Sequence, residues 1–228
     1  TKSKGDCFME MKNMPVCDLR AVKTVESASS IHLIENVALV VFPQDAPPEL
    51  KNALAAIPQK NVASTLWLHD TDRLQTENGF SHLNPGQLSK EYTTVCLVNG
   101  FAVAEAIPAD YKVDLIINGM ILLHENNKKE SGLKINTING LSAYADFDHC
   151  LTAGDTFQID TEFLKYAKPK TAILAGDTIK IDKNVTSEML AEKIAYLVAA
   201  DTIICYQAAS GFVRANSLCG DEIVVKEQ

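Results

Sequence analysis

The sequence repeats one short phrase three times, as Leu97-Val98-Asn99-Gly100-Phe101, Ile116-Ile117-Asn118-Gly119-Met120 and Thr137-Ile138-Asn139-Gly140-Leu141. In each copy, apolar residues alternate around an Asn-Gly pair, as they do in a half-buried β-strand. Asn and Gly adopt positive φ at little cost, so the pair allows a sharp bend between two short strands. The phrase therefore predicts a strand, a bend and a second strand.

Later copies replace Asn-Gly by Gly-Asp and keep the surrounding pattern. Residues 152–160 match residues 174–182 almost letter for letter, and weaker copies occupy 199–204 and 218–225. Upstream copies are more divergent and lie at residues 34–39, 60–66 and 76–80. Ten positions are then equivalent, with a mean step of about 20 residues and single steps from 14 to 25, namely 37, 62, 79, 100, 119, 140, 154, 176, 200 and 220.

Three segments between these copies have a helical pattern. Residues 47–57 begin with two prolines, as helix starts prefer, and place apolar residues on one face. Residues 160–167 begin with an Asp that can cap a first turn, and residues 186–197 offer Thr186 or Ser187 as a cap. A strand, a bend, a strand and a helical or loop return fit within one repeat.

This pattern predicts a β-rich, β-helix-like repeat solenoid of about ten coils of ~20 residues, with short helical segments in some coils. We expect residues 1–30 to form an irregular N-terminal cap and residues 31–228 to form a single elongated repeat domain. Asn-Gly is also the strongest short signal for a β-hairpin, which leaves an alternative in which the glycines lie at the hairpin tips of a sandwich.

Two repeat families fit the spacing poorly. A leucine-rich repeat needs apolar residues upstream of its buried Asn, whereas Asn136 and Lys134 precede Asn139. Hexapeptide repeats fail because no six-residue period runs inside a copy. Over residues 75–225, the short strands meeting at bends of small residues resemble the β-solenoids of bactofilin-like scaffold proteins, and this resemblance implies a scaffolding role.

Composition excludes several classes of function. The 29 acidic residues outnumber the 21 basic residues, and the net charge of −8 argues against a nucleic-acid partner. No apolar run is long enough to span a membrane, and Thr1 to Asp6 lack the apolar segment of a secretory signal. The six cysteines have no metal-ligand or redox spacing, so we expect inert, mostly buried thiols and a reducing cytoplasm.

Two clusters carry the residue types used in catalysis. His69-Asp70-Thr71-Asp72 is best explained as a turn after a strand. Asp146-Phe147-Asp148-His149-Cys150 offers two carboxylates, an imidazole and a thiol, although adjacent strand residues such as His149 and Cys150 face opposite sides. No nucleotide-binding, hydrolase or zinc-protease motif occurs. We therefore predict no catalytic, cofactor-binding or metal-binding residues and no cofactor.

The sequence favours a non-enzymatic cytoplasmic scaffold or protein-interaction protein, whose partner is another protein or a second copy of itself. An enzyme of unknown type that uses the residues Asp146 to Cys150 is one alternative. A surface ligand-binding module is another, and it requires a secretion signal upstream of Thr1.

Overall fold

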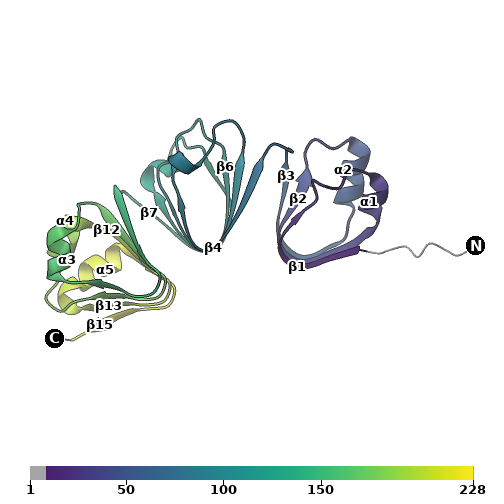
Figure 1. The fold of residues 1–228 in the computed structure, drawn as a ribbon. Coiled ribbons are helices and arrows are strands. Elements are labelled where there is room, and N and C mark those ends of the chain that lie inside the picture. Colours follow the sequence, from purple (N-terminus) through teal and green to yellow (C-terminus); the bar gives the residue numbers. More distant parts are fainter. Residues whose placement is uncertain (1–8, 228) are drawn as a thin grey trace, which may run out of the picture. The chain divides into compact units, whose positions relative to one another are not determined.

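The computed structural model describes residues 9–227 and divides the chain into two compact units, one ending at Asp72 and the other beginning at Arg73 (Figure 1). Every strand pair among the described residues is parallel. Parallel neighbours need a long crossover connection, and the helices and loops between successive strands supply it. The strands form four sheets of three or four strands each.

The first unit is a three-stranded sheet with two helices. Its elements, in chain order, are β1 (Met9–Asp18), α1 (Val25–Ser29), β2 (Ile31–Pro43), α2 (Pro48–Ala55) and β3 (Gln59–Leu68), and the sheet order is β1-β2-β3. The helices lie at the open side of the bent strands (Figure 1). Leu50 and Leu54 of α2 join Ile34 and Phe42 of β2 in the core, which fixes the helix against the sheet.

Each strand of the first unit bends at an asparagine. Asn13, Asn36 and Asn61 have φ values of 54°, 57° and 51°, a left-handed conformation that Asn tolerates better than most residues. Their side chains form a ladder, because Nδ2 of Asn36 donates to Oδ1 of Asn13 and Nδ2 of Asn61 donates to Oδ1 of Asn36, both at 2.8 Å.

The second unit begins with a four-stranded sheet, which we call the central sheet. Its elements are β4 (Arg73–Leu83), η1 (Pro85–Gln87), β5 (Thr94–Ala104), β6 (Val113–His124), η2 (Glu125–Lys128) and β7 (Leu133–Ala145), and the strands lie in chain order. Gly79, Gly100, Gly119 and Gly140 are direct neighbours across the sheet. All four have positive φ, from 93° to 150°, so the Asn-Gly pair bends each strand at the same level.

The remainder of the second unit has two narrow sheets and a layer of helices. One sheet has the order β14-β12-β10-β8 and the other β15-β13-β11-β9. The elements are β8 (His149–Ala153), β9 (Phe157–Ile159), α3 (Thr161–Tyr166), β10 (Thr171–Ala175), β11 (Ile179–Ile181), α4 (Ser187–Lys193), β12 (Ile194–Ala199), β13 (Ile203–Tyr206), η3 (Gln207–Ala209), α5 (Ser210–Ala215), β14 (Ser217–Cys219) and β15 (Ile223–Lys226). Their apolar side chains enclose one core.

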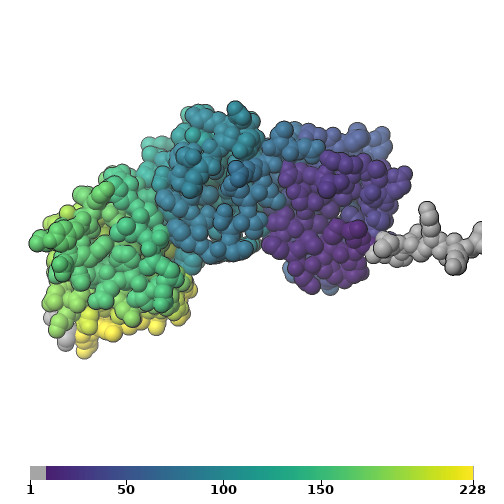
Figure 2. Space-filling view, in the orientation of Figure 1, coloured from purple at the N-terminus to yellow at the C-terminus, as the bar shows by residue number. Residues whose placement is uncertain are grey.

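The central sheet packs against the sheet made of β8, β10, β12 and β14, which we call the β8–β14 sheet. Val103, Met120 and Leu122 on one face of the central sheet share a buried cluster with Leu174 of β10 and Val198 of β12. In Figure 2 the teal and green residues of this unit adjoin on the side shown. The two inner strands of the central sheet, β5 and β6, are therefore apolar on both faces, and their sequences are nearly continuous hydrophobic runs on either side of the Asn-Gly pair.

The predicted equivalence of repeat positions is confirmed within each sheet. Val37 pairs with Val62, and Gly100 pairs with both Gly79 and Gly119. In the last part of the chain, Gly176 N donates to Ala153 O and Gly220 N donates to Ala199 O.

The prediction of a single β-solenoid of about ten coils is wrong. The described strands form four separate sheets, and no pairing joins β3 to β4 or β7 to β8. Only residues 69–72 connect β3 to β4 and only residues 146–148 connect β7 to β8, which is too short for a crossover that returns the chain parallel to the previous strand. These connections coincide with the two shortest repeat steps, of 17 and 14 residues.

The three predicted helices are present, with one boundary changed. Helix α2 begins after Pro47, and the Asp160 side chain caps α3 by accepting a hydrogen bond from Phe163 N. Thr186 caps α4, but the segment predicted as a helix to residue 197 leaves the helix at Lys193 and continues as β12. Residues 194–197 are rich in side chains that pack well in a sheet, and pairing with β10 overrides their helical spacing.

The N-terminal segment contributes a strand. Of the residues 1–30 predicted as an irregular cap, residues 1–8 lie outside the described residues, and residues 9–18 form β1, which pairs with β2. The bend at Asn13 has the same left-handed conformation as those at Asn36 and Asn61, and the repeat pattern in the sequence does not identify it because Lys12 and Met14 flank it. The residues predicted as one elongated domain, 31–228, extend through both units.

Candidate functional site

The residues of the cluster from Asp146 to Cys150 lie in different environments. Asp146 and Asp148 are exposed in the connection between β7 and β8, whereas His149 and Cys150 begin strand β8. Asp146 accepts a hydrogen bond from Lys170 Nζ at 2.6 Å and lies 3.8 Å from Nε2 of His124. The Lys170 hydrogen bond lowers the pKa of Asp146, which stays ionised as one partner of a surface ion pair.

Cys150 is unsuited to nucleophilic chemistry. Its side chain belongs to the cluster between the central sheet and the β8–β14 sheet, and burial raises the pKa of its thiol to about 12. A thiol with this pKa is protonated at neutral pH, whereas the thiolate is the nucleophile and metal ligand. No group of three or more His, Cys, Asp or Glu side chains within residues 9–227 is arranged to hold a metal ion.

The second predicted cluster forms the turn that was expected. His69 N donates to Oδ2 of Asp72, and Asp72 N donates back to His69 O at 3.1 Å. Nδ1 of His69 lies 2.6 Å from Oδ1 of Asp45, so the imidazole is held beside a carboxylate at the end of β3. Arg20 adds hydrogen bonds to the carbonyl groups of His69 and Asp72. These contacts tie the turn to the first unit.

The cysteines of the described segment behave as the sequence predicts. Cys17, Cys96 and Cys205 are buried, and Cys150 and Cys219 are partly buried. Burial raises the pKa of all five thiols. They are therefore weakly reactive packing residues.

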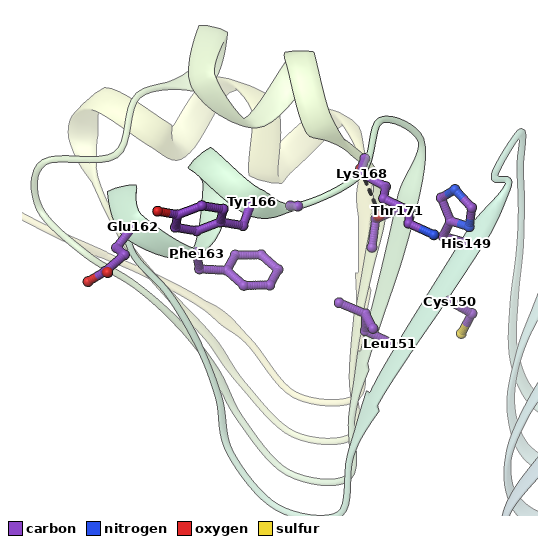
Figure 3. A pocket seen from close by; sticks show the side chains of 9 residues that line it. His149, Cys150, Leu151, Glu162, Phe163, Tyr166, Lys168 and Thr171 are labelled. Carbon is purple, nitrogen blue, oxygen red and sulfur yellow. Dashed lines mark hydrogen bonds between the residues drawn. The ribbon is translucent and has the colours of Figure 1, made fainter.

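An apolar pocket of about 540 Å³ lies between β8 and α3 in the second unit. In Figure 3, Leu151 points from β8 toward Phe163 of α3, while the sulfur of Cys150 points away from the pocket. Tyr166 and Lys168 lie at its rim. Leu151 is 40% exposed and Tyr166 is 72% exposed, although both are large and partly apolar.

This pocket is the uncovered end of a buried core. Leu151 continues a column of inward-facing residues, because it pairs with Ile173, which pairs with Leu197. Phe157 similarly pairs with Ile179 and packs edge-on against Phe163, with ring centroids 5.3 Å apart. The columns stop here because β8 and β9 are the edge strands of their sheets.

Sequence reasoning missed this pocket, although a signal was present. The first copy of the Gly-Asp phrase carries Phe157 where the next copy carries Ile179. A larger aromatic side chain at the end of a column covers more of an exposed core than isoleucine does.

Comparisons with protein-family models, with curated proteins and with solved structures find no match to this chain. The resemblance to bactofilin-like scaffold proteins therefore stays a prediction. None of the helices formed by residues 9–227 has the length and apolar character needed to cross a membrane.

Proposed function

We propose that this chain is a non-enzymatic scaffold or interaction protein, and that a protein partner binds at the open end formed by β8, β9 and α3. The uncovered apolar pocket beside the edge strand β8 is the observation that carries this proposal. Exposed apolar surface next to an unpaired strand edge is costly unless a partner covers it.

The expected mode of binding is addition of a parallel strand. Strand β8 pairs only with β10, so the backbone groups on its other side are open to a partner segment. Main-chain hydrogen bonds to such an edge supply affinity, and pockets for alternate side chains supply specificity. A partner residue on the inner face would contact Leu151 and Phe163, which lie on opposite sides of the pocket.

Two further features support a binding role in a reducing compartment. Two of the residues with catalytic potential in this region, Cys150 and Asp146, are a protonated thiol and a carboxylate paired with Lys170. The five described cysteines are free thiols, which is typical of cytoplasmic proteins.

Selection of peptides from a displayed library on the immobilised full chain tests the proposal. Peptides that bind should lose affinity for a Leu151→Asp variant, because the charge lies in the apolar pocket. Leu141→Asp is the matched control, since Leu141 on β7 is also 40% exposed and lies outside the pocket. Peptides that bind both variants equally, or a library that yields no binder, would contradict the proposal. An activity screen with Asp148→Ala as control addresses the enzyme alternative.

A further inference from the structure

We propose that the partner at this open end is a second copy of the chain, bound through the opposite end of its second unit. This inference rests on the proposed function, since it identifies the protein that pairs with β8. It predicts a head-to-tail contact, which uses two different surfaces and can therefore continue from copy to copy.

The second unit has two distinct ends. The edge strands β4, β8 and β9 form one end, which we call the head, and β7, β14 and β15 form the other, which we call the tail. Gly79 of β4 and Gly154 beside β8 line one cleft of about 440 Å³, so these two edges belong to the same end. At the tail, β7 and β14 are in contact. The tail of a second copy can therefore contact the edge strands of both sheets at the head of the first copy.

Glycines within the sheets show what the head is shaped to receive. A Cβ on Gly100, Gly119 or Gly140 would overlap the carbonyl oxygen of the glycine on the preceding strand. Gly176 and Gly220 are crowded in the same way by the carbonyl groups of Gly154 and Ala200.

The head glycines Gly79 and Gly154 have nothing within 4 Å of that position. The space that a preceding strand fills elsewhere is empty at both of them. Gly140 and Gly220 occupy the matching positions at the tail, and their carbonyl groups would enter these two spaces.

The backbone hydrogen-bonding groups at the head of one copy are complementary to those at the tail of another copy. Gly176 N donates to Ala153 O and Gly220 N donates to Ala199 O, while Asp177 N donates to Asp155 O and Asp221 N donates to Asp201 O. At the head, the corresponding donors on Gly154 and Asp155 have no preceding strand. The corresponding acceptors at the tail are the carbonyl groups of Cys219 and Asp221, which pair with no later strand among residues 9–227.

The asparagine ladder of the central sheet has the polarity that such a contact needs. Asn99 donates to Asn78, Asn118 donates to Asn99 and Asn139 donates to Asn118, with distances of 2.8 to 3.0 Å. Within this ladder, Asn78 acts only as an acceptor and Asn139 only as a donor. Nδ2 of Asn78 at the head and Oδ1 of Asn139 at the tail are therefore complementary.

One apolar column continues from one end to the other, because Phe157, Ile179, Ile203 and Ile223 lie in register, whereas the column of Leu151 ends at the polar Ser217. By the register of the sheets, Ser217 of the second copy would lie beside Leu151, and Ile223 of the second copy beside Phe157. Cys219 and Ile223 are partly buried and pack against the same core as Phe157. The proposed contact covers the edge strands β8 and β9, and Tyr166 of α3 lies outside it.

The test uses the full chain and one variant that blocks each end. Gly154→Val blocks the head, and because Gly154 has open space and no positive φ, the fold of the isolated chain should keep its melting temperature. Ile223→Lys blocks the tail by placing a charge on the half-buried edge strand β15. Val225→Lys replaces it if the melting temperature of Ile223→Lys falls.

Light scattering and sedimentation velocity across a concentration series supply the readout. The wild type should grow in mean mass with concentration, and each blocked variant should stay at the monomer mass of 24.9 kDa. A mixture of Gly154→Val with Ile223→Lys should form a species of twice that mass, because one variant retains an intact tail and the other an intact head. Asn78→Asp should weaken association by about tenfold, since it loses the outward donor and keeps the acceptor for Asn99.

The opposite results overturn the inference. A wild type that stays monomeric at its highest soluble concentration excludes the second copy as the partner, whereas peptides that depend on Leu151 would still uphold the proposed function. A wild type that associates while Gly154→Val associates equally well places the contact elsewhere. Self-association without a dimer in the mixture of blocked variants contradicts the head-to-tail arrangement.

Discussion

Asn118 donates a hydrogen bond from Nδ2 to Oδ1 of Asn99 over 2.8 Å, and the two residues are 19 positions apart in the chain. The same bond recurs between Asn139 and Asn118, so an interior asparagine of the central sheet is both donor and acceptor. A one-residue slip of any strand would bring an asparagine opposite a glycine or an aliphatic residue. The ladder therefore specifies the register of the sheet as well as satisfying polar groups at the bend.

Loss of one amide donor within the ladder should destabilise the second unit. Asn118→Asp keeps an oxygen that accepts from Asn139 and loses the donor to Asn99, so we expect a loss of about 1–3 kcal/mol in the free energy of unfolding. Asn78→Asp is the matched control, because Asn78 donates to no other ladder member and the change should cost less than about 0.5 kcal/mol. Urea unfolding of the monomeric chain at low concentration, followed by far-ultraviolet circular dichroism, measures both, and equal losses would refute the directional ladder.

The bend glycines make a second prediction. Gly119 has a φ of 141°, and a Cβ there would overlap Gly100 O. Gly119→Val should therefore destabilise the second unit by about 1–3 kcal/mol or more, because the backbone strain adds to the steric overlap. Differential scanning calorimetry with Gly154→Val as control separates this effect from the general cost of a valine. An unchanged melting temperature for Gly119→Val would mean that the strands do not bend at this residue as described.

These glycines also show how far the sequence alone can predict the fold. The alternation around Asn-Gly and Gly-Asp identified the strands, the bends and the positions that become neighbours, since each is a local property of a few residues. The division into sheets was missed because it depends on connection length: residues 69–72 and 146–148 are too short to return the chain for parallel pairing. The mean step of about 20 residues between repeat positions hides the two short steps that contain these connections.

The candidate site was less predictable than the fold. Histidine, carboxylates and a thiol drew attention to the residues from Asp146 to Cys150, yet the thiol of Cys150 faces a buried cluster and Asp146 pairs with Lys170. The pocket depends instead on Leu151 and Phe163, which look like ordinary core residues in the sequence. Only the position of β8 at a sheet edge leaves them uncovered, and edge positions follow from the tertiary structure.

Acid should weaken the first unit through Asp18. Burial raises the pKa of this carboxyl, but the hydrogen bonds and positive charge of Arg20 outweigh burial and lower the pKa below its ordinary value of 3.8. A group with a lowered pKa in the folded state stabilises the fold above its ordinary pKa, and this contribution is lost as the pH falls through the lowered value. For this reason, we expect the melting temperature of the first unit to decrease when the pH is lowered below about 4.

Asp18→Asn tests this assignment. The variant should be less stable than the wild type at neutral pH, and its stability should depend less on pH in the acidic range, because the ionisable group is gone. Thermal melts at several pH values from neutral to acidic give the comparison, with Asp148→Asn as the control for an exposed carboxylate. Parallel curves for Asp18→Asn and the wild type would show that Asp18 carries no such contribution.

The buried thiols of Cys96 and Cys150 provide a prediction about chemical labelling. The pKa values of Cys96 and Cys150 are raised to about 12 by burial, so neither forms an appreciable thiolate at neutral pH. Iodoacetamide labelling of a Cys7→Ser variant, followed by mass spectrometry of peptides, should be slow at both sites in the folded chain and fast in denaturant. Rapid labelling of folded Cys150 would restore it as a candidate nucleophile.

The proposed contact between copies brings like charges together, and this makes it dependent on salt. Asp155, Asp177, Asp201 and Asp221 are connected one to the next by backbone hydrogen bonds, so a second copy would place its own Asp221 next to Asp155. The net charge of −8 adds to this repulsion. Because the Debye length shrinks to about 10 Å at 0.1 M salt, association measured by sedimentation should strengthen as salt is raised from a low concentration.

Asp221→Asn should associate more tightly at low salt and respond less to added salt, while Glu26→Gln in the first unit should behave as the wild type. A contact that weakens with salt, or an Asp221→Asn variant that keeps the full salt response, would show that these carboxylates are not opposed across the interface.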